Sequence, residues 1–216
     1  MKYKCLVFDH DDTVVNSTAT IHYPCFVEFN TLRHPALVRF TLEQFLQYNF
    51  DPGLTAFYRD ICGLNEEEIR EEQEYWLGYT RQHRATAIPG IREVMERHRA
   101  EGGIIAVVSH SFSENILRDF AVNGLPEPDA VFGFEQPREE RKPSPVPARK
   151  ILERFRLSPE DALVIDDLKP GYLMARAAGV DFAAAAWTYE IPANAQFMKA
   201  NADYYCRTVA ELEEII

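Results

Sequence analysis

Four acidic side chains stand at the ends of two apolar runs in the sequence. Asp9 and Asp11 follow the run Cys5–Phe8, and Asp166 and Asp167 follow a later run. Carboxylate oxygens in that number suit Mg²⁺, which keeps several waters and often shares its coordination shell with a phosphate. A single acid such as Asp166, taken alone, is explained as well by a helix cap or a turn as by a metal site. If all four meet, they indicate a site for Mg²⁺ and a phosphate.

The charge of the chain favours the same interpretation. The formal net charge is −11, so nonspecific binding to nucleic acid is not expected. The four acids together with Lys142 carry a charge of about −3, and a divalent cation brings it to about −1. A bound Mg²⁺ would therefore allow a phosphate dianion to enter an acidic protein.

Two further residues could hold the phosphate. Ser109 follows the apolar run Ile104–Val108 and precedes a helical pattern, so its hydroxyl and the neighbouring amides can donate to a phosphoryl oxygen. Lys142 lies in a loop that Pro143 and Pro145 stiffen. A positive charge held there could neutralise the phosphoryl group. Taken singly, such a serine is an ordinary helix cap and such a lysine is a solvated charge.

Strand and helix patterns alternate along most of the chain. Apolar runs predict buried strands at Cys5–Phe8, Ile104–Val108, Ala162–Ile165 and, more weakly, Val180–Trp187. Amphipathic patterns predict helices at Ile91–His98, Ser113–Val122, Pro147–Phe155 and Gly171–Ala178. The alternation predicts an α/β fold, a doubly wound parallel sheet of Rossmann-like type with helices on both faces. Ligands bind such sheets beyond the carboxyl ends of the strands, where the polar residues above stand.

The region 17–87 interrupts this alternation. It has no apolar strand run, and it shows helical stretches at Leu42–Tyr48 and Glu66–Thr80. Asn65 followed by three glutamates is typical of a helix start. We therefore expect a small all-helical insertion over 17–87 and a catalytic core formed by 1–16 and 88–216. The aromatic residues Tyr23, Phe26, Phe29 and Phe57 are expected to pack between helices, and candidate anion contacts in the insertion are Arg33, His34, Arg39, Arg81, His83 and Arg84.

Cysteine usage and hydropathy suggest a compartment. The four cysteines form no CxxC pair and show no zinc-ligand spacing. The first residues lack the apolar stretch of a signal peptide, so we expect reduced thiols and a cytoplasmic location. No segment approaches the roughly 20 apolar residues that span a membrane. The expected partner is a small phosphorylated metabolite rather than a membrane or nucleic acid, with monomer and homodimer both open.

Four segments, in order, resemble the motifs of the haloacid dehalogenase superfamily. They are Phe8-Asp9-His10-Asp11-Asp12-Thr13-Val14-Val15, Val107-Val108-Ser109, Lys142-Pro143 and Val164-Ile165-Asp166-Asp167. Asp12 stands where this family usually has glycine, and His10 and His110 occupy variable positions. The resemblance covers nearly the whole core, and it implies that the helical insertion is a cap that closes over small substrates and excludes water.

The resemblance also implies roles for the residues. Asp9 would attack phosphorus to give an aspartyl-phosphate, and its carboxylate would bind Mg²⁺. Asp11 would act as general acid and then as general base, with its backbone carbonyl on the metal. Asp167 would be the principal acidic metal ligand of the last motif, with Asp166 as a second ligand or as outer support. The expected contacts to the phosphate and its surroundings come from Ser109, His110, Lys142 and Thr13, the last of which would also hold the Asp11 loop.

Several activities remain compatible with these motifs. Dehalogenases of the superfamily lack an aspartate at the position of Asp11, because a departing halide needs no proton. The presence of Asp11 therefore favours a magnesium-dependent phosphatase that acts on small phosphomonoesters. A sugar phosphomutase of the same superfamily is the alternative. A catalytically weak binding protein is a further one, and the complete set of acids argues against it.

Overall fold

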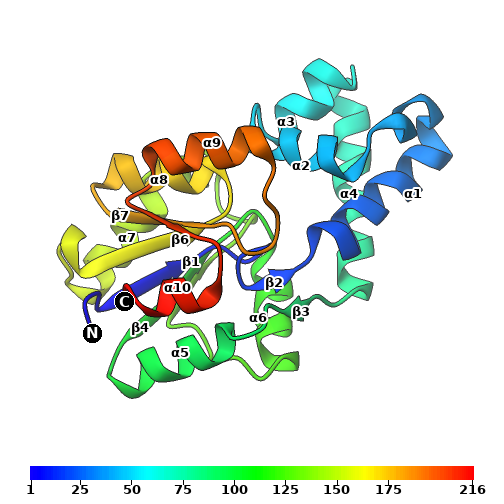
Figure 1. Ribbon diagram of the computed structural model, residues 1–216. Helices are drawn as coiled ribbons and strands as arrows, with labels where there is room; N and C mark the ends of the chain where they lie inside the picture. The colour runs from blue at the N-terminus through cyan, green and yellow to red at the C-terminus, as the bar shows by residue number, and fades with distance from the viewer. The chain divides into compact units, whose positions relative to one another are not determined.

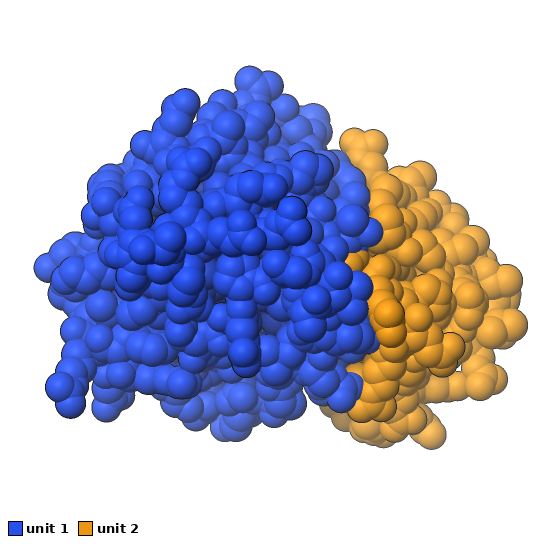
Figure 2. Space-filling model, turned by 90° about the horizontal axis from the view of Figure 1, so that it is seen from below, with its two compact units in different colours: residues 1–16, 86–216 blue, residues 17–85 orange.

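The computed structural model describes residues 1–216, which form two compact units (Figure 2). The core unit comprises Met1–Asn16 and Thr86–Ile216, and the helical unit comprises Ser17–Ala85. None of the helices combines the length and the apolar character that crossing a membrane would require.

The core unit is built on a six-stranded parallel sheet. Its strands are β1 (Cys5–Phe8), β4 (Ile104–Val108), β5 (Ala130–Phe132), β6 (Ala162–Asp166), β7 (Asp181–Ala185) and β8 (Tyr204–Cys206). The order across the sheet is β5-β4-β1-β6-β7-β8. Cys5 of the central strand β1 pairs with Ile104 on one side and with Ala162 on the other. The carboxyl ends of β1, β4 and β6 therefore lie next to one another at one edge of the sheet.

Helices cover both faces of this sheet. Figure 1 shows α5, α6 and α10 on one face and α7, α8 and α9 on the other. Their bounds are α5 Ile91–Ala100, α6 Ser113–Val122, α7 Val146–Phe155, α8 Lys169–Ala178, α9 Pro192–Asn201 and α10 Val209–Glu213, with single 3-10 turns at Arg138–Glu140 and Pro159–Asp161. The predicted α/β class with a doubly wound, Rossmann-like parallel sheet is confirmed.

Two short strands stand where the chain leaves and re-enters the core unit. β2 (Val15–Asn16) and β3 (Thr86–Ala87) form an antiparallel pair, and the amide of Ile88 donates to the carbonyl of Val14 at 2.9 Å. The core unit therefore resumes at Thr86, two residues before the expected position, because Thr86 and Ala87 pair with the strand that follows the first acidic motif.

The helical unit packs around aromatic side chains. It contains α1 (Tyr23–Arg33), α2 (Leu42–Phe50), α3 (Leu54–Ala56) and α4 (Glu66–Gln82), with single helical turns at Thr18–His22, Pro35–Arg39 and Phe57–Ile61. Asn65 caps α4 as expected, because its side chain accepts hydrogen bonds from the amides of Glu67 and Glu68. Phe26 and Phe57 are buried in the centre of the unit, which confirms that these aromatic residues pack between helices.

Candidate active site

Three carboxylates from two distant motifs meet at the carboxyl edge of the sheet. Asp9 follows β1, while Asp166 ends β6 and Asp167 follows it. One oxygen from each lies within 4.8 Å of the others. The amide of Asp9 donates to the carbonyl of Ile165 at 2.8 Å, so the ladder between neighbouring parallel strands itself brings the two motifs together.

Lys142 lies inside this group of acids. Its Nζ is 2.8 Å from Asp9 Oδ1 and 2.5 Å from Asp166 Oδ2, and the residue is only 6% exposed. Burial opposes the charge, but the carboxylates of Asp166 and Asp9 outweigh that effect and raise the pKa of Lys142 above its ordinary value. The ammonium group is therefore a fixed positive charge that holds the nucleophile candidate and one metal-ligand candidate in place.

A single ammonium group does not balance these three carboxylates, of which Asp9 and Asp166 are buried and Asp167 is half-buried. Burial raises the pKa of Asp166 to about 7, even though Lys142 favours its ionised form. Burial and the neighbouring acids, Asp166 first among them, raise the pKa of Asp167 well above its ordinary value. Hard oxygen ligands that share excess negative charge fit a divalent cation such as Mg²⁺. The donor set of Asp9, Asp166 and Asp167 thus has the chemistry of a magnesium site.

The position of Asp166 depends on the helix that follows it. Its Oδ1 accepts a hydrogen bond of 2.7 Å from the amide of Leu168, immediately before α8. A Cβ atom at Gly171 would stand 2.1 Å from Asp166 Oδ2. Only glycine lets the first turn of α8 approach the carboxylate this closely.

Asp11 does not join the three-carboxylate group. Its Oδ2 accepts hydrogen bonds from Ser111 Oγ at 2.6 Å and from Ser109 Oγ at 3.3 Å. The expectation that four carboxylates gather is therefore corrected to three, because the hydroxyls that follow β4 hold the fourth. The proposed contact of Asp11 with a metal runs through its backbone carbonyl and stays a prediction.

Ser111 was missing from the predicted site. It stands two residues after Ser109, so the spacing of the two hydroxyls along an extended segment could have indicated that they face the same way. Its amide also donates to Ser109 Oγ at 3.1 Å. The pair of serines therefore forms one connected group of donors around Asp11 Oδ2.

The remaining predicted residues make supporting contacts. Thr13 Oγ1 lies 3.4 Å from Asp167 Oδ1, so the hydroxyl is directed at a metal-ligand candidate rather than at Asp11. His110 Nε2 lies 3.0 Å from the backbone carbonyl of Lys142, which links the loop after β4 to the lysine loop. Contacts of Thr13 and His110 with phosphate stay predictions.

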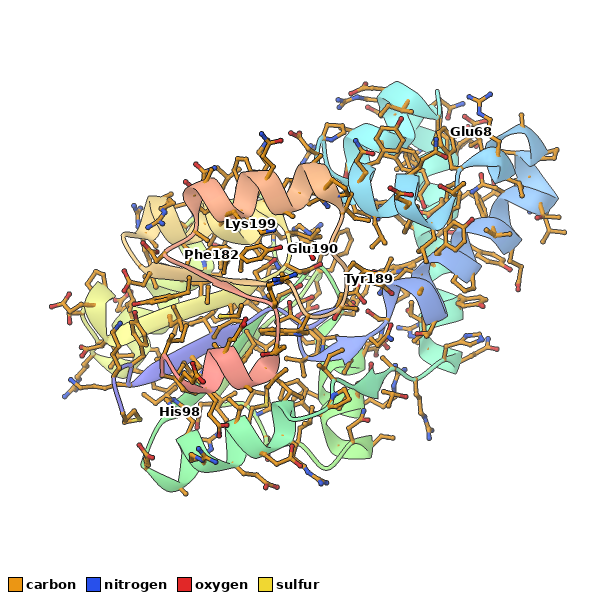
Figure 3. All side chains as sticks on the ribbon, in the orientation of Figure 1. Glu68, His98, Phe182, Tyr189, Glu190 and Lys199 are labelled. Atoms are coloured by element: carbon orange, nitrogen blue, oxygen red, sulfur yellow. The ribbon has the colours of Figure 1, made fainter.

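The segment after β7 holds the loop that carries Asp11 to Asn16. Thr188 Oγ1 donates to the carbonyl of Asp12 at 2.6 Å, and Trp187 Nε1 donates to the carbonyl of Thr13 at 3.1 Å. Tyr189, labelled in Figure 3, places its hydroxyl 3.4 Å from Asn16 Oδ1. The apolar pattern predicts Trp187 only as the end of a weak strand, whereas β7 ends at Ala185. The segment 187–189 is thus a clamp on the loop 11–16 after β1, and sequence reasoning missed it.

The conformation of Asp12 explains the unusual residue in the first motif. Its φ angle is 57°, in the left-handed region that glycine adopts without cost. Aspartate tolerates this region better than most residues because its short polar side chain can bond locally. The position still has the backbone of the expected glycine, so the substitution keeps the turn.

Several candidate anion contacts of the helical unit are engaged within that unit. Arg33 Nη2 pairs with Glu71 at 2.8 Å, and the guanidinium of Arg39 lies 5.2 Å from the centre of the Phe40 ring. The His83 ring stacks on Tyr79, with 3.9 Å between the ring centres. These contacts describe surface packing, and they do not single out a residue that reads the substrate.

Comparisons with known proteins show which family model, relatives and solved structures this chain matches. A family model described as haloacid dehalogenase-like hydrolase matches residues 6–185. A provisionally named pyrophosphatase, PpaX, of Caldanaerobacter subterraneus is 28% identical over all of this chain and 96% of its own length. A phosphoglycolate phosphatase of Haemophilus influenzae is 24% identical over all of this chain and 99% of its own. A solved structure from Bacteroides fragilis, provisionally named a haloacid dehalogenase-like hydrolase, shares the fold with a TM-score of 0.81 at 21% identity, over 98% of this chain and 100% of that one.

Proposed function

This chain belongs to the haloacid dehalogenase-like hydrolase family, and from that premise we propose that it is a magnesium-dependent phosphatase of small phosphomonoesters. The observation that carries the proposal is the group formed by Asp9, Lys142, Asp166 and Asp167 at one edge of the sheet. It supplies a nucleophile, a fixed positive charge and the ligands for a divalent cation within a few ångströms.

In the first chemical step, a carboxylate oxygen of Asp9 forms a bond to phosphorus while the bond from phosphorus to the ester oxygen breaks. Asp11 gives its proton to the departing oxygen, so the alcohol leaves neutral and an aspartyl-phosphate remains. Both serine hydroxyls approach Asp11 Oδ2, and we therefore assign the proton transfer to Oδ1. A covalent intermediate divides one difficult displacement into two easier ones.

In the second step, Asp11 takes a proton from water, and the water oxygen attacks phosphorus. The bond from phosphorus to Asp9 breaks, which releases inorganic phosphate and restores the carboxylate. The same residue thus serves as acid and then as base. Ser111, whose hydroxyl makes the shorter of the two contacts at 2.6 Å, holds Asp11 in place during this exchange of roles.

The site favours this chemistry electrostatically. Asp9, Asp166 and Asp167 would hold Mg²⁺, which when bound neutralises the charge of the phosphoryl group and orients it for attack. Lys142 holds Asp9 Oδ1 and adds a positive charge that the phosphoryl oxygens can approach. Ser109 lies between Asp11 and the start of α6, where hydroxyl and backbone amides can donate to the transferring group.

We assign the substrate class from chemistry and relatives together. Three relatives are named phosphoglycolate phosphatases and one is provisionally named a pyrophosphatase, so small acidic phosphate compounds are the first to test. The helical unit would act as the family's cap, which closes over a small substrate and excludes bulk water from the reacting phosphate, while the single water of the second step is admitted.

The test is a phosphate-release screen with Mg²⁺ present. The panel contains phosphoglycolate, sugar phosphates, nucleotides, pyrophosphate and p-nitrophenyl phosphate, and Asp9→Asn is the blank because an amide cannot attack phosphorus. We expect turnover that Asp9→Asn abolishes. Release of phosphate from no compound would refute the phosphatase. Isomerisation of a hexose phosphate without release would instead identify the phosphomutase.

A further inference from the structure

One histidine stands between the two reacting aspartates and faces the interior. His10 is 1% exposed, and its ring stacks on Phe120 of α6 with 6.2 Å between the ring centres. Its Nε2 lies 3.3 Å from Oδ2 of Asp119, which is also buried, at 3% exposed. The nucleophile loop is therefore joined to α6 by a polar contact inside the protein.

The direction of this hydrogen bond follows from the neighbours of Asp119. The other carboxylate oxygen, Oδ1, accepts hydrogen bonds from Arg118 at 3.1 and 3.0 Å. A carboxylate paired with a guanidinium only accepts, so His10 must donate from Nε2. Asp119 thus fixes both the position and the tautomer of the imidazole.

The contact carries a cost that folding stability alone does not explain. The second ring nitrogen of His10, Nδ1, is buried and has no hydrogen-bond partner in the protein. A buried polar atom without a partner lowers stability, because it gives up its hydrogen bonds to water and gains none in the protein. An apolar ring in the same space would avoid the cost at Nδ1 but would leave the buried Asp119 Oδ2 without its hydrogen bond, so the two effects on stability oppose each other. The contribution of His10 therefore lies in the geometry that it imposes.

His10 lies where a shift would reach both reacting groups. Its backbone carbonyl accepts hydrogen bonds from the amides of Val14 at 2.9 Å and Val15 at 3.1 Å, which close the turn that carries Asp11. α6, which carries Asp119, begins just after the serines that donate to Asp11 (Figure 1). Asp119 of α6 therefore holds the loop 9–15, which carries Asp9 and Asp11, through the contact with His10. The same helix directly follows the segment that carries Ser109 and Ser111.

We propose that His10 and Asp119 form a positioning pair that holds the nucleophile loop in register with α6, so that Asp9 and Asp11 keep their reactive geometry. This inference rests on the proposed function. The pair touches no reacting atom and acts only by fixing the backbone between Asp9 and Asp11. Misplacement of a reacting group by about 1 Å can cost about a hundredfold in rate.

The test compares four variants with p-nitrophenyl phosphate as substrate. His10→Phe keeps the ring and its stacking but removes the hydrogen bond, and we expect kcat to fall at least about tenfold with little change in KM. Asp119→Leu should cause the same loss, whereas Asp119→Asn, whose amide oxygen still accepts from Nε2, should stay within about threefold of the parent enzyme. His10→Phe combined with Asp119→Leu should lose no more than either single change, because both remove one interaction.

Melting temperatures distinguish a positioning role of His10 from a role in folding stability alone. We expect His10→Phe to melt within about 4 °C of the parent, a shift worth about 1 kcal/mol in a chain of this size. The matched control is His98→Phe in α5 (Figure 3), which removes another buried imidazole, one that lies 3.2 Å from the carbonyl of Ile104. It should lower the melting temperature and leave kcat unchanged.

Three results would overturn the inference while the proposed function stands. One is an active parent enzyme whose His10→Phe variant keeps kcat within about twofold. Another is a loss of kcat that only follows the loss of folded protein. The third is a pair of single-variant losses that add in the double variant. If the parent enzyme itself releases no phosphate from any compound of the panel, the proposed function fails and this inference fails with it.

Discussion

A buried glutamate makes the stability of the helical unit depend on pH. Glu72 lies in α4 and is 5% exposed, and the Tyr58 hydroxyl donates to its Oε1 at 2.7 Å. Burial raises its pKa from 4.5 to about 7, against the opposing effects of the Tyr58 hydrogen bond and of His22. The folded state therefore binds the carboxyl proton more tightly than the unfolded state does.

The sign and size of the effect follow by linkage. When the folded state binds the proton more tightly, the free energy of unfolding falls as pH rises between the two pKa values. It stays constant below about 4.5 and above about 7. Each pKa unit corresponds to about 1.4 kcal/mol, so the whole change for Glu72 is about 3 kcal/mol.

Glu72→Gln isolates this contribution. The amide can still accept the Tyr58 hydrogen bond but does not ionise, so the variant lacks this part of the pH dependence. We expect its stability relative to the parent to rise by about 3 kcal/mol between pH 4.5 and pH 7.5. Urea unfolding followed by tryptophan fluorescence measures it, because Trp76 lies on the same helix, one turn from Glu72.

The matched control is Glu74→Gln, which removes an exposed carboxylate from the same helix. It should shift the free energy of unfolding by no more than about 0.5 kcal/mol at any pH. A difference between Glu72→Gln and the parent that does not change with pH would refute the reasoning, since it would mean that burial does not disfavour the ionised form.

Three further predictions concern the active site. Chelation should stop phosphate release and added Mg²⁺ should restore it, because three carboxylates share one ammonium group. A chelated enzyme that keeps its rate would contradict the charge argument. Gly171→Ala should lower kcat and metal affinity by displacing Asp166, since the added Cβ would stand 2.1 Å from Oδ2. Titration with Mg²⁺ in a calorimeter measures the metal affinity. The control is Gly78→Ala, because nothing lies within 4 Å of a Cβ at that position. Thr188→Val removes the hydroxyl that donates to the carbonyl of Asp12 and should lower the free energy of unfolding by about 1 kcal/mol. We expect kcat to fall by more than this loss of stability explains. Melting curves and steady-state rates on the same samples measure both effects.

Much of the sheet was accessible to sequence reasoning because its strands are continuous apolar runs. β1 and β4 have the bounds that their runs predict. β5 and β8 were missed, since each has three residues and contributes too short a run to differ from a loop. α9 was missed as well, because its sequence, rich in alanine and asparagine, lacks a strong amphipathic pattern.

The residues of the candidate site likewise fall into those that the sequence predicts and those that only the structure shows. Asp9 and Asp166 could be named in advance because each belongs to a short motif at a strand end, and the topology brings these ends together. Lys142 could be named because it belongs to a motif in a proline-stiffened loop before α7. The contacts of Ser111 and of the clamp at Trp187 and Thr188 could not. They depend on which elements become neighbours and on where each side chain points, and neither is written in local spacing.

The structural costs around Asp9 point to function independently of the motifs. Two non-glycine residues have positive φ angles, Asp12 and Arg156. Arg156 ends α7, where a left-handed residue is a common way to close a helix. Asp12, by contrast, lies in the loop after β1, next to the candidate residues Asp9 and Asp11. That loop also contains His10, with its unpartnered ring nitrogen, and it lies beside Asp166, whose buried carboxyl is hard to ionise. Unfavourable local arrangements of this kind are kept only where the surrounding structure holds them in place, and they cluster at functional sites. Here the fold supplies that restraint from α6, from β6 and from the clamp after β7, so the loop is held by parts of the chain that only the complete core unit brings together.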